Sequence, residues 1–210
     1  MTRILIADDH EVVRSGLRRI LESKPKWQVV AEAADGKQAI TRALAEKPDV
    51  AVLDYGLPLI NGVEATRQIR ARLPKTEVLI FTVHDTETLV RDLLAAGARG
   101  YLLKSDAGRF LIDAVESLAH HKPFFTAKIS EALLSAYLSK PGDDRLSLTP
   151  RERGVVQLIA EGHTNKQVAT ILNISPKTVE AHRAAIMRKL NLSSTAALVR
   201  YAVRHKIVET

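Results

Sequence analysis

Acidic residues follow two of the short apolar runs in the first half of the chain. Asp8 and Asp9 come directly after the run 3–7 (RILIA), and Asp54 comes after the run 50–53 (VAVL). Clustered carboxylates repel one another and raise each other's pKa unless a cation neutralises them. Oxygen ligands that form an incomplete cage suit Mg²⁺ and leave it open to a phosphate group. These residues therefore predict a magnesium site that handles phosphate.

A hydroxyl and an ammonium group stand at the ends of two further runs. Thr82 ends the run 77–82 (EVLIFT), and Lys104 follows the run 100–103 (GYLL). A carboxylate can attack phosphorus and form an aspartyl phosphate, so Asp54 is the candidate nucleophile once a metal is bound. Lys104 would then contact the phosphoryl oxygens as a point charge, and Thr82 would contact them as a hydrogen-bond donor.

These side chains meet only if a scaffold brings several strand ends together. Apolar β-branched runs alternate with segments of helical periodicity as far as about residue 120. Such runs indicate buried parallel strands, and five βα units predict an α/β doubly wound, five-stranded parallel sheet. Ligands bind beyond the carboxyl ends of the strands in a sheet of this kind. The five predicted strands are 3–7, 27–33, 50–53, 77–82 and 100–103.

Three helix starts follow one another closely after residue 147. The segments 149–152 (TPRE) and 164–167 (TNKQ) match a capping box, and Ser175 precedes Pro176 as a good N-cap before proline at N1. The strand pattern is absent from this half. Short helices in close succession predict a separate all-α domain with a helix-turn-helix.

The net charge of +7 is concentrated near the C-terminus. Residues 141–210 hold 11 Lys and Arg against 6 Asp and Glu, whereas residues 1–140 hold 20 against 18. A basic cluster is the electrostatic footprint of a nucleic-acid binder, although a solvated basic surface explains the charge alone equally well. Together with the helix-turn-helix pattern, the charge predicts double-stranded DNA as the partner.

The composition excludes several classes of protein. The chain has no cysteine, so it has neither a disulfide framework nor a thiolate metal site. Acidic residues interrupt the first apolar run after five residues, and no stretch approaches the ~18 apolar residues of a membrane span. We therefore expect a cytoplasmic protein with no membrane partner.

A polar segment separates the two halves. Residues 139–144 (SKPGDD) combine Pro, Gly and acidic residues as interdomain linkers do, and a connecting helix is expected over about 127–138. The predicted organisation is an α/β domain over 1–122, a connecting helix and linker over 123–147, and a helical domain over 148–210.

Taken together, these positions resemble a known family. Residues 1–122 are similar to the flavodoxin-like receiver domain of two-component response regulators, and 148–192 are similar to a LuxR-type helix-turn-helix, the combination of the NarL/FixJ type. The resemblance implies that a sensor histidine kinase phosphorylates Asp54 and thereby controls sequence-specific DNA binding and transcription. It also implies a homodimer on DNA and no enzymatic activity.

The resemblance also assigns residues in the phosphorylation pocket. It implies that the carboxylates of Asp8, Asp9 and Asp54 and the backbone carbonyl of Gly56 bind Mg²⁺. It further implies that Thr82 and Tyr101 couple phosphorylation to the surface formed by the fourth helix, fifth strand and fifth helix.

The third helix of the second half, over about 176–190, is expected to be the recognition helix. At 100° per residue it has two distinct faces. The packing face holds Val179, His182, Ile186 and Leu190. The opposite face holds Lys177, Glu180, Ala181, Ala184 and Arg188.

The opposite face has the residue types that enter a major groove. Ala181 and Ala184 permit close approach to base edges, and Glu180 can accept a hydrogen bond from cytosine N4. The resemblance implies that a helix over about 194–205 contributes to dimerisation, although its apolar stripe could equally be core within the domain. Candidates for phosphate contacts are Lys166, Lys177, Arg183, Arg188 and Lys189.

Two other functions stay open at this point. An aspartate-nucleophile phosphohydrolase would share the acidic pocket, but it would place a D-x-D pattern after the first strand, where this chain has adjacent Asp8 and Asp9. A DNA-binding protein that works without phosphorylation, and uses its α/β domain only to dimerise, fits the same sequence.

Overall fold

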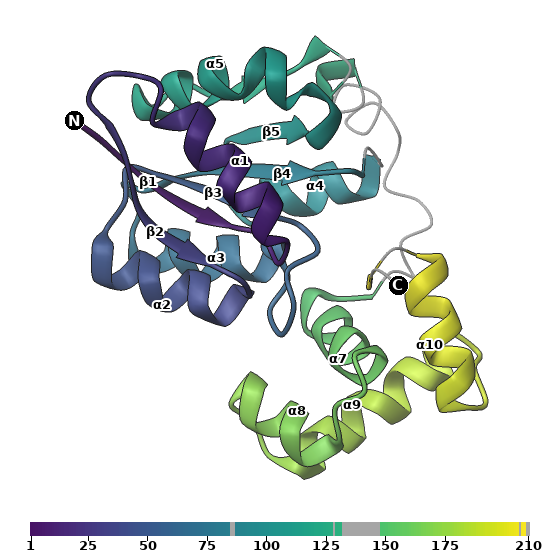
Figure 1. Ribbon diagram of the computed structural model, residues 1–210. Helices are drawn as coiled ribbons and strands as arrows, with labels where there is room; N and C mark the ends of the chain where they lie inside the picture. Colours follow the sequence, from purple (N-terminus) through teal and green to yellow (C-terminus); the bar gives the residue numbers. More distant parts are fainter. Residues whose placement is uncertain (85–86, 128, 132–147, 206, 209–210) are drawn as a thin grey trace. The chain divides into compact units, whose positions relative to one another are not determined.

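The computed structural model describes residues 1–84, 87–127, 129–131, 148–205 and 207–208 (Figure 1). The chain divides into two compact units, Met1–Lys140 and Pro141–Thr210, and each is described by itself. The expected linker at 139–144 lies outside the described residues, as does most of the expected helix at 127–138. Residues 127 and 129–131 are helical.

The N-terminal unit is built on a parallel sheet, as the sequence predicts. Within the described residues the strands follow the order β2-β1-β3-β4-β5-β6, and each neighbouring pair is parallel. The strands are β1 (Thr2–Ala7), β2 (Trp27–Ala33), β3 (Val50–Asp54), β4 (Glu77–Thr82), β5 (Gly100–Leu103) and β6 (Phe124–Phe125).

All five predicted strands are present, and the described part of the sheet has a short sixth strand in addition. Phe124 pairs with Gly100 and Phe125 pairs with Tyr101. The amide of Phe124 donates to the carbonyl of Arg99 over 2.9 Å. Two aromatic residues are too short a run to predict a strand, and this pairing depends on contacts distant in sequence.

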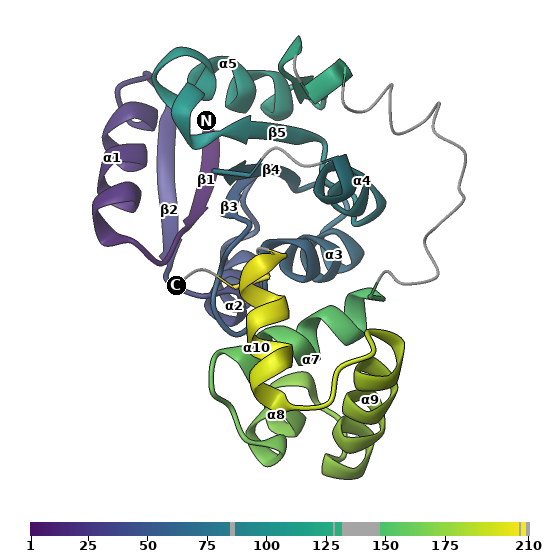
Figure 2. The same cartoon turned by 90° about the vertical axis from the view of Figure 1, so that its right-hand side faces the viewer.

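Helices cover both faces of the sheet, as doubly wound folds require (Figure 2). Alternate strand residues face opposite sides: Ile4 and Ile6 belong to one buried cluster, whereas Leu5 and Ala7 belong to the other. The first cluster includes residues of α1 (Glu11–Leu21) and α5 (Ala107–Ala119). The second includes residues of α2 (Gly36–Glu46), α3 (Gly62–Arg72) and α4 (Glu87–Ala95).

The strand register brings the chemically active residues to one edge. The residue before Asp8 pairs with the residue before Asp54, so the two carboxylates emerge side by side. Thr82, the last residue of β4, pairs with the residue before Lys104. Four side chains from distant parts of the sequence therefore share the carboxyl edge of the sheet.

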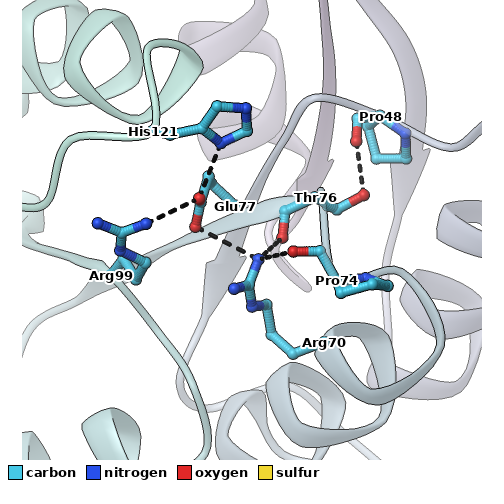
Figure 3. A network of polar contacts seen from close by, with 7 residues as sticks. All are labelled: Pro48, Arg70, Pro74, Thr76, Glu77, Arg99 and His121. Atoms are coloured by element: carbon cyan, nitrogen blue, oxygen red, sulfur yellow. Dashed lines mark hydrogen bonds and ion pairs between the residues drawn. The ribbon is translucent and has the colours of Figure 1, made fainter.

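A buried carboxylate occupies the amino end of β4, the opposite end from those side chains (Figure 3). Only 3% of the Glu77 side chain is exposed. Its Oε2 lies 3.3 Å from Arg70 Nη1, and its Oε1 lies 3.2 Å from Arg99 Nη1 and 3.0 Å from His121 Nδ1. A buried charge without such partners would be strongly destabilising. The partners of Glu77 come from three other segments, so the cluster connects β4 to α3, to the turn before β5 and to the end of α5.

The C-terminal unit is helical throughout its regular elements, as predicted. Both capping boxes are present, and Ser175 caps the helix that starts at Pro176. Gly162 and Asn173 adopt left-handed φ angles of 88° and 53° at the preceding helix ends. No described helix of the chain is both long and apolar enough to cross a bilayer. The helices are α7 (Pro150–Ala160), α8 (Asn165–Leu172), α9 (Pro176–Lys189) and α10 (Thr195–Arg204).

We expect Gly62→Ala to destabilise the N-terminal unit by about 1–3 kcal/mol, the usual cost of overpacking. A Cβ at Gly62 would lie 2.4 Å from the backbone oxygen of Asp54, so α3 or the end of β3 would have to shift. Urea unfolding measures the effect, and the fluorescence of the chain's single tryptophan, Trp27 on β2, reports on this unit.

The matched control is Gly16→Ala on α1, where a Cβ meets nothing within 4 Å. This substitution should raise the unfolding free energy by about 0.5–1 kcal/mol, because alanine favours the helix. Equal effects at the two glycines would contradict the close approach of α3 to Asp54.

Candidate functional site

An ammonium group lies between two buried carboxylates at the carboxyl edge of the sheet. Lys104 Nζ is 2.8 Å from Asp8 Oδ2 and 3.0 Å from Asp54 Oδ2. Asp8 is fully buried and Asp54 is 3% exposed. Partial burial acts to lower the pKa of the Lys104 ammonium, but the charges and hydrogen bonds of Asp54 and Asp8 outweigh it, so the pKa is raised. Lys104 therefore stays protonated and holds both carboxylates.

The turn after β1 fixes the two adjacent aspartates differently. The amide of His10 donates to Asp8 Oδ1 over 2.9 Å, and the amide of Asp8 donates to the carbonyl of Ala33 over 3.1 Å. The side chain of Asp9 is 39% exposed, and its Oδ1 lies 2.7 Å from His10 Nδ1. Asp8 thus belongs to the pocket interior and Asp9 to its solvent side. The sequence interpretation did not include His10, which directly follows the acidic pair.

The donor set suits a hard divalent cation. Asp8, Asp9 and Asp54 form an acidic pocket, and ligand atoms of Asp8, Asp9 and His10 lie within 4.8 Å of one another. Lys104 brings one positive charge to three carboxylates, so the pocket retains negative charge. Gly56, whose carbonyl was expected to be a ligand, follows Asp54 by two residues and is half-buried. Carboxylate and carbonyl oxygens with an open solvent side fit Mg²⁺.

Thr82 and Tyr101 meet at a residue that the sequence interpretation did not name. Both side chains are 1% exposed. The amide of His84 donates to Thr82 Oγ1 over 3.2 Å, and the Tyr101 hydroxyl donates to the carbonyl of His84. The His84 ring also packs edge-on against Tyr55, with 5.7 Å between ring centroids. The chain just after β4 is therefore bound to β4 and β5 at once.

The outward face of α9 is accessible in the C-terminal unit. Lys166 on α8 is exposed as well. On the other side of α9, Val179 and Ile186 are fully buried and His182 is half-buried. The two faces predicted from the periodicity are therefore those of the folded helix. The exposed residues of the outward face are Lys177, Glu180, Ala181, Ala184 and Arg188.

Two of the expected phosphate-contacting residues have partners within the domain. Arg183 donates from Nη1 to Asn165 Oδ1 over 2.7 Å and from Nη2 to Thr195 Oγ1 over 3.0 Å, which joins α8, α9 and α10. Lys189 Nζ lies 3.0 Å from Glu152 Oε2, part of the cap of α7. These two side chains already have a structural role in the domain.

Each of the two units matches a different known protein family. Residues 4–116 match the response regulator receiver domain, and residues 146–202 match bacterial regulatory proteins of the luxR family. The chain is a NarL/FixJ-type response regulator. This membership confirms the resemblance inferred from the sequence. It makes the chain a two-component transcription regulator with a DNA-binding domain, and excludes the phosphohydrolase alternative.

Relatives cover almost the whole response regulator. The oxygen regulatory protein NreC of Staphylococcus epidermidis is 39% identical over 216 residues, which cover 99% of each chain. NreC of Staphylococcus carnosus is 38% identical over 215 residues, with the same coverage. The order of the two domains is therefore the same in these proteins.

Solved structures resemble the chain along its length. RcsB from Salmonella enterica serovar Typhimurium, bound to promoter P1flhDC in the presence of the phosphomimetic BeF3−, has a TM-score of 0.69 and 27% identity, and the match covers 97% of this chain and 98% of that one. The response regulator ChrA of a heme-sensing two-component system has a TM-score of 0.53 and 35% identity, covering 99% and 98%.

We expect Lys104→Met to destabilise the N-terminal unit by about 3 kcal/mol at neutral pH, because it leaves buried carboxylates without their cation. A lysine with a raised pKa contributes stability that is complete below its ordinary pKa and is lost as pH rises through the raised value. The difference between wild type and variant should therefore hold to about pH 10.5 and shrink above it. Urea titrations at several pH values, followed by Trp27 fluorescence, measure it.

Lys24→Met is the control, because Lys24 is 45% exposed and lies 3.9 Å from its partner Glu116. An exposed ion pair of this kind contributes about 0–1 kcal/mol. If the two methionine variants lose equal stability, the Lys104 ammonium does not hold the pocket together.

Proposed function

We propose that Asp54 is the phosphoacceptor of this response regulator and that its phosphorylation controls DNA binding. The observation that supports this most directly is the Lys104 ammonium between Asp54 and Asp8. The Lys104 ammonium can move its hydrogen bond from a carboxylate oxygen to an incoming phosphoryl oxygen without a further positive charge becoming buried. Thr82, at the end of the neighbouring strand, is the candidate hydroxyl donor to the same group.

Magnesium is the proposed cofactor of this pocket. Its proposed ligands are the carboxylates of Asp8, Asp9 and Asp54 and the backbone carbonyl of Gly56. When bound, the ion supplies positive charge that offsets the repulsion between the phosphodonor and Asp54. Lys104 contributes the second positive charge, from the side of β5.

Tyr101 and Thr82 are the proposed coupling residues. Since the Tyr101 hydroxyl and the Thr82 oxygen both bind the backbone of His84, a displacement of Thr82 toward a phosphoryl group would pull on the contact that holds Tyr101. The surface that would respond includes α4, β5 and α5, and β6 occupies the outer edge of β5 there.

The remaining assignments are proposed on the basis of the family and of the residues. We propose a receiver domain over 1–122, a connecting helix and linker over 123–147 and a helix-turn-helix domain over 148–210. A sensor histidine kinase is the proposed phosphodonor in the cytoplasm, and double-stranded DNA is bound by a homodimer. Phosphorylation would raise operator affinity by shifting the population toward the competent state.

A phosphorylation-independent regulator is the second candidate. It is favoured if operator affinity and oligomeric state are the same before and after treatment with acetyl phosphate. A rise in either quantity, absent in Asp54→Asn, favours the switch.

Asp54→Asn should abolish phosphoryl incorporation from radiolabelled acetyl phosphate, because the amide removes the nucleophile and nearly preserves its shape. Asp113→Asn, an equivalent change at an exposed position of α5, should label as the wild type does. Asp9→Ala and excess chelator should each suppress wild-type labelling. Undiminished labelling of Asp54→Asn would refute this assignment.

On α9, Arg188→Ala should weaken binding to all DNA sequences. Loss of one phosphate contact should reduce the slope of log K against log salt by about 1. Glu180→Gln should change preference at one base pair by roughly 1–3 kcal/mol, because a carboxylate only accepts hydrogen bonds whereas an amide also donates. Selection from randomised operators, together with salt titrations, measures both effects.

The two substitutions are each other's control, since both lie on the exposed face of one helix. If Arg188→Ala changes the selected sequence and Glu180→Gln leaves it unchanged, the proposed placement of α9 in the groove is wrong.

A further inference from the structure

A side chain of α1 holds the backbone at the point where the chain leaves β1. Arg14 Nη1 donates to the carbonyl oxygen of Asp8 over 2.9 Å. The Arg14 side chain is only 16% exposed. The carbonyl that it binds belongs to the peptide group between Asp8 and Asp9, the two adjacent acidic residues of the pocket.

A carboxylate on the edge strand β2 holds the same arginine from the other side. Glu32 Oε2 accepts from Arg14 Nε at 3.3 Å, and Glu32 Oε1 accepts from Arg18 Nε at 2.6 Å. Partial burial acts to raise the pKa of Glu32, but hydrogen bonds and charges from Arg18 and Arg14 outweigh it and lower the pKa. Glu32 therefore remains an anion at neutral pH, and the guanidinium of Arg14 is held between it and the backbone of Asp8.

The hydrogen bond from Arg14 to the Asp8 carbonyl also affects where the Asp9 side chain points. A peptide group is planar, so a hydrogen bond that fixes the Asp8 carbonyl also fixes the amide nitrogen of Asp9. The Asp8 side chain has Lys104 as a separate anchor, at 2.8 Å. The Asp9 side chain is 39% exposed on the solvent side of the pocket. Its described partner is the neighbouring His10, whose Nδ1 lies 2.7 Å from Asp9 Oδ1 on the same turn, so the position of the carboxylate depends on how the backbone of that turn is oriented.

We propose that Arg14 is a positioning residue for the divalent cation of the pocket. It sets the peptide group between Asp8 and Asp9 and thereby places the Asp9 carboxylate where it can act as a ligand. The inference rests on the proposed function of the pocket as a metal site. Groups that orient metal ligands from outside typically contribute about 10–100-fold to metal affinity.

The structure provides a matched control on the same helix. Arg14 and Arg18 bind the two oxygens of one carboxylate, Glu32, but the described contact to the Asp8 carbonyl comes from Arg14. Arg14→Gln removes the ion pair and the bond to Asp8. Arg18→Gln removes the ion pairs to Glu32 and Glu22 and leaves the bond to Asp8 in place.

The test measures Mn²⁺ binding to the full chain, with Mn²⁺ as the probe and the electron paramagnetic resonance signal of the free ion as the readout. Arg14→Gln should raise the Mn²⁺ dissociation constant about tenfold. Arg18→Gln should change it by less than about twofold, because its ion pairs are partly exposed and contribute little, and because Arg14 keeps its bond to the Asp8 carbonyl. Arg14→Lys, which keeps the charge and one donor at reduced reach, should recover part of the affinity.

Thermal unfolding of each variant separates positioning from general stability. Unfolding midpoints that fall together for Arg14→Gln and Arg18→Gln, with a changed dissociation constant for Arg14→Gln alone, support the proposal. Equal dissociation constants for the two variants overturn it, as does an unchanged constant in Arg14→Gln. Asp9→Ala tests the pocket itself: wild-type Mn²⁺ affinity in that variant would refute the proposed metal site independently of Arg14.

Discussion

One ammonium group between two buried carboxylates is the constraint on which the N-terminal domain depends. Lys104 Nζ reaches Asp54 and Asp8 from the end of β5, although β4 lies between β5 and β3 in the sheet. The long lysine side chain spans that distance and brings its charge to 5.9 Å from the ring centroid of Phe81 on β4. A parallel sheet whose carboxyl ends share one edge is what makes this contact attainable.

The same requirement, that buried charge be compensated locally, shapes the other end of the sheet. Glu77 is as buried as Asp54, and two arginines and a histidine surround it. These compensating groups come from α3, the turn before β5 and the end of α5. Each end of the sheet therefore has its own charge balance. The carboxyl edge differs because its acids outnumber Lys104, which leaves an excess of negative charge that a divalent cation would offset.

In the DNA-binding domain, some polar side chains connect the helices to one another and others face the solvent. Glu152 closes the capping box of α7 and binds Lys189. Partial burial acts to raise the pKa of Glu152, but these contacts outweigh the effect of burial and lower the pKa. Arg183 joins three helices through its two hydrogen bonds. The exposed charges of α9 are those at Lys177, Glu180 and Arg188. Some of the positive charge of this domain therefore connects its helices, and only the rest stays exposed for contact with a partner.

The sequence by itself determined the fold class, the caps of the C-terminal helices and the residues at the strand ends, because hydrophobic periodicity and capping are local properties. Only the tertiary structure decided which other side chains lie next to the residues at the strand ends. His84 joins Thr82 to Tyr101, Arg14 holds the Asp8 carbonyl, and β6 pairs with β5. These contacts depend on strand order, register and helix orientation, which bring together residues far apart in the chain and have no local signal.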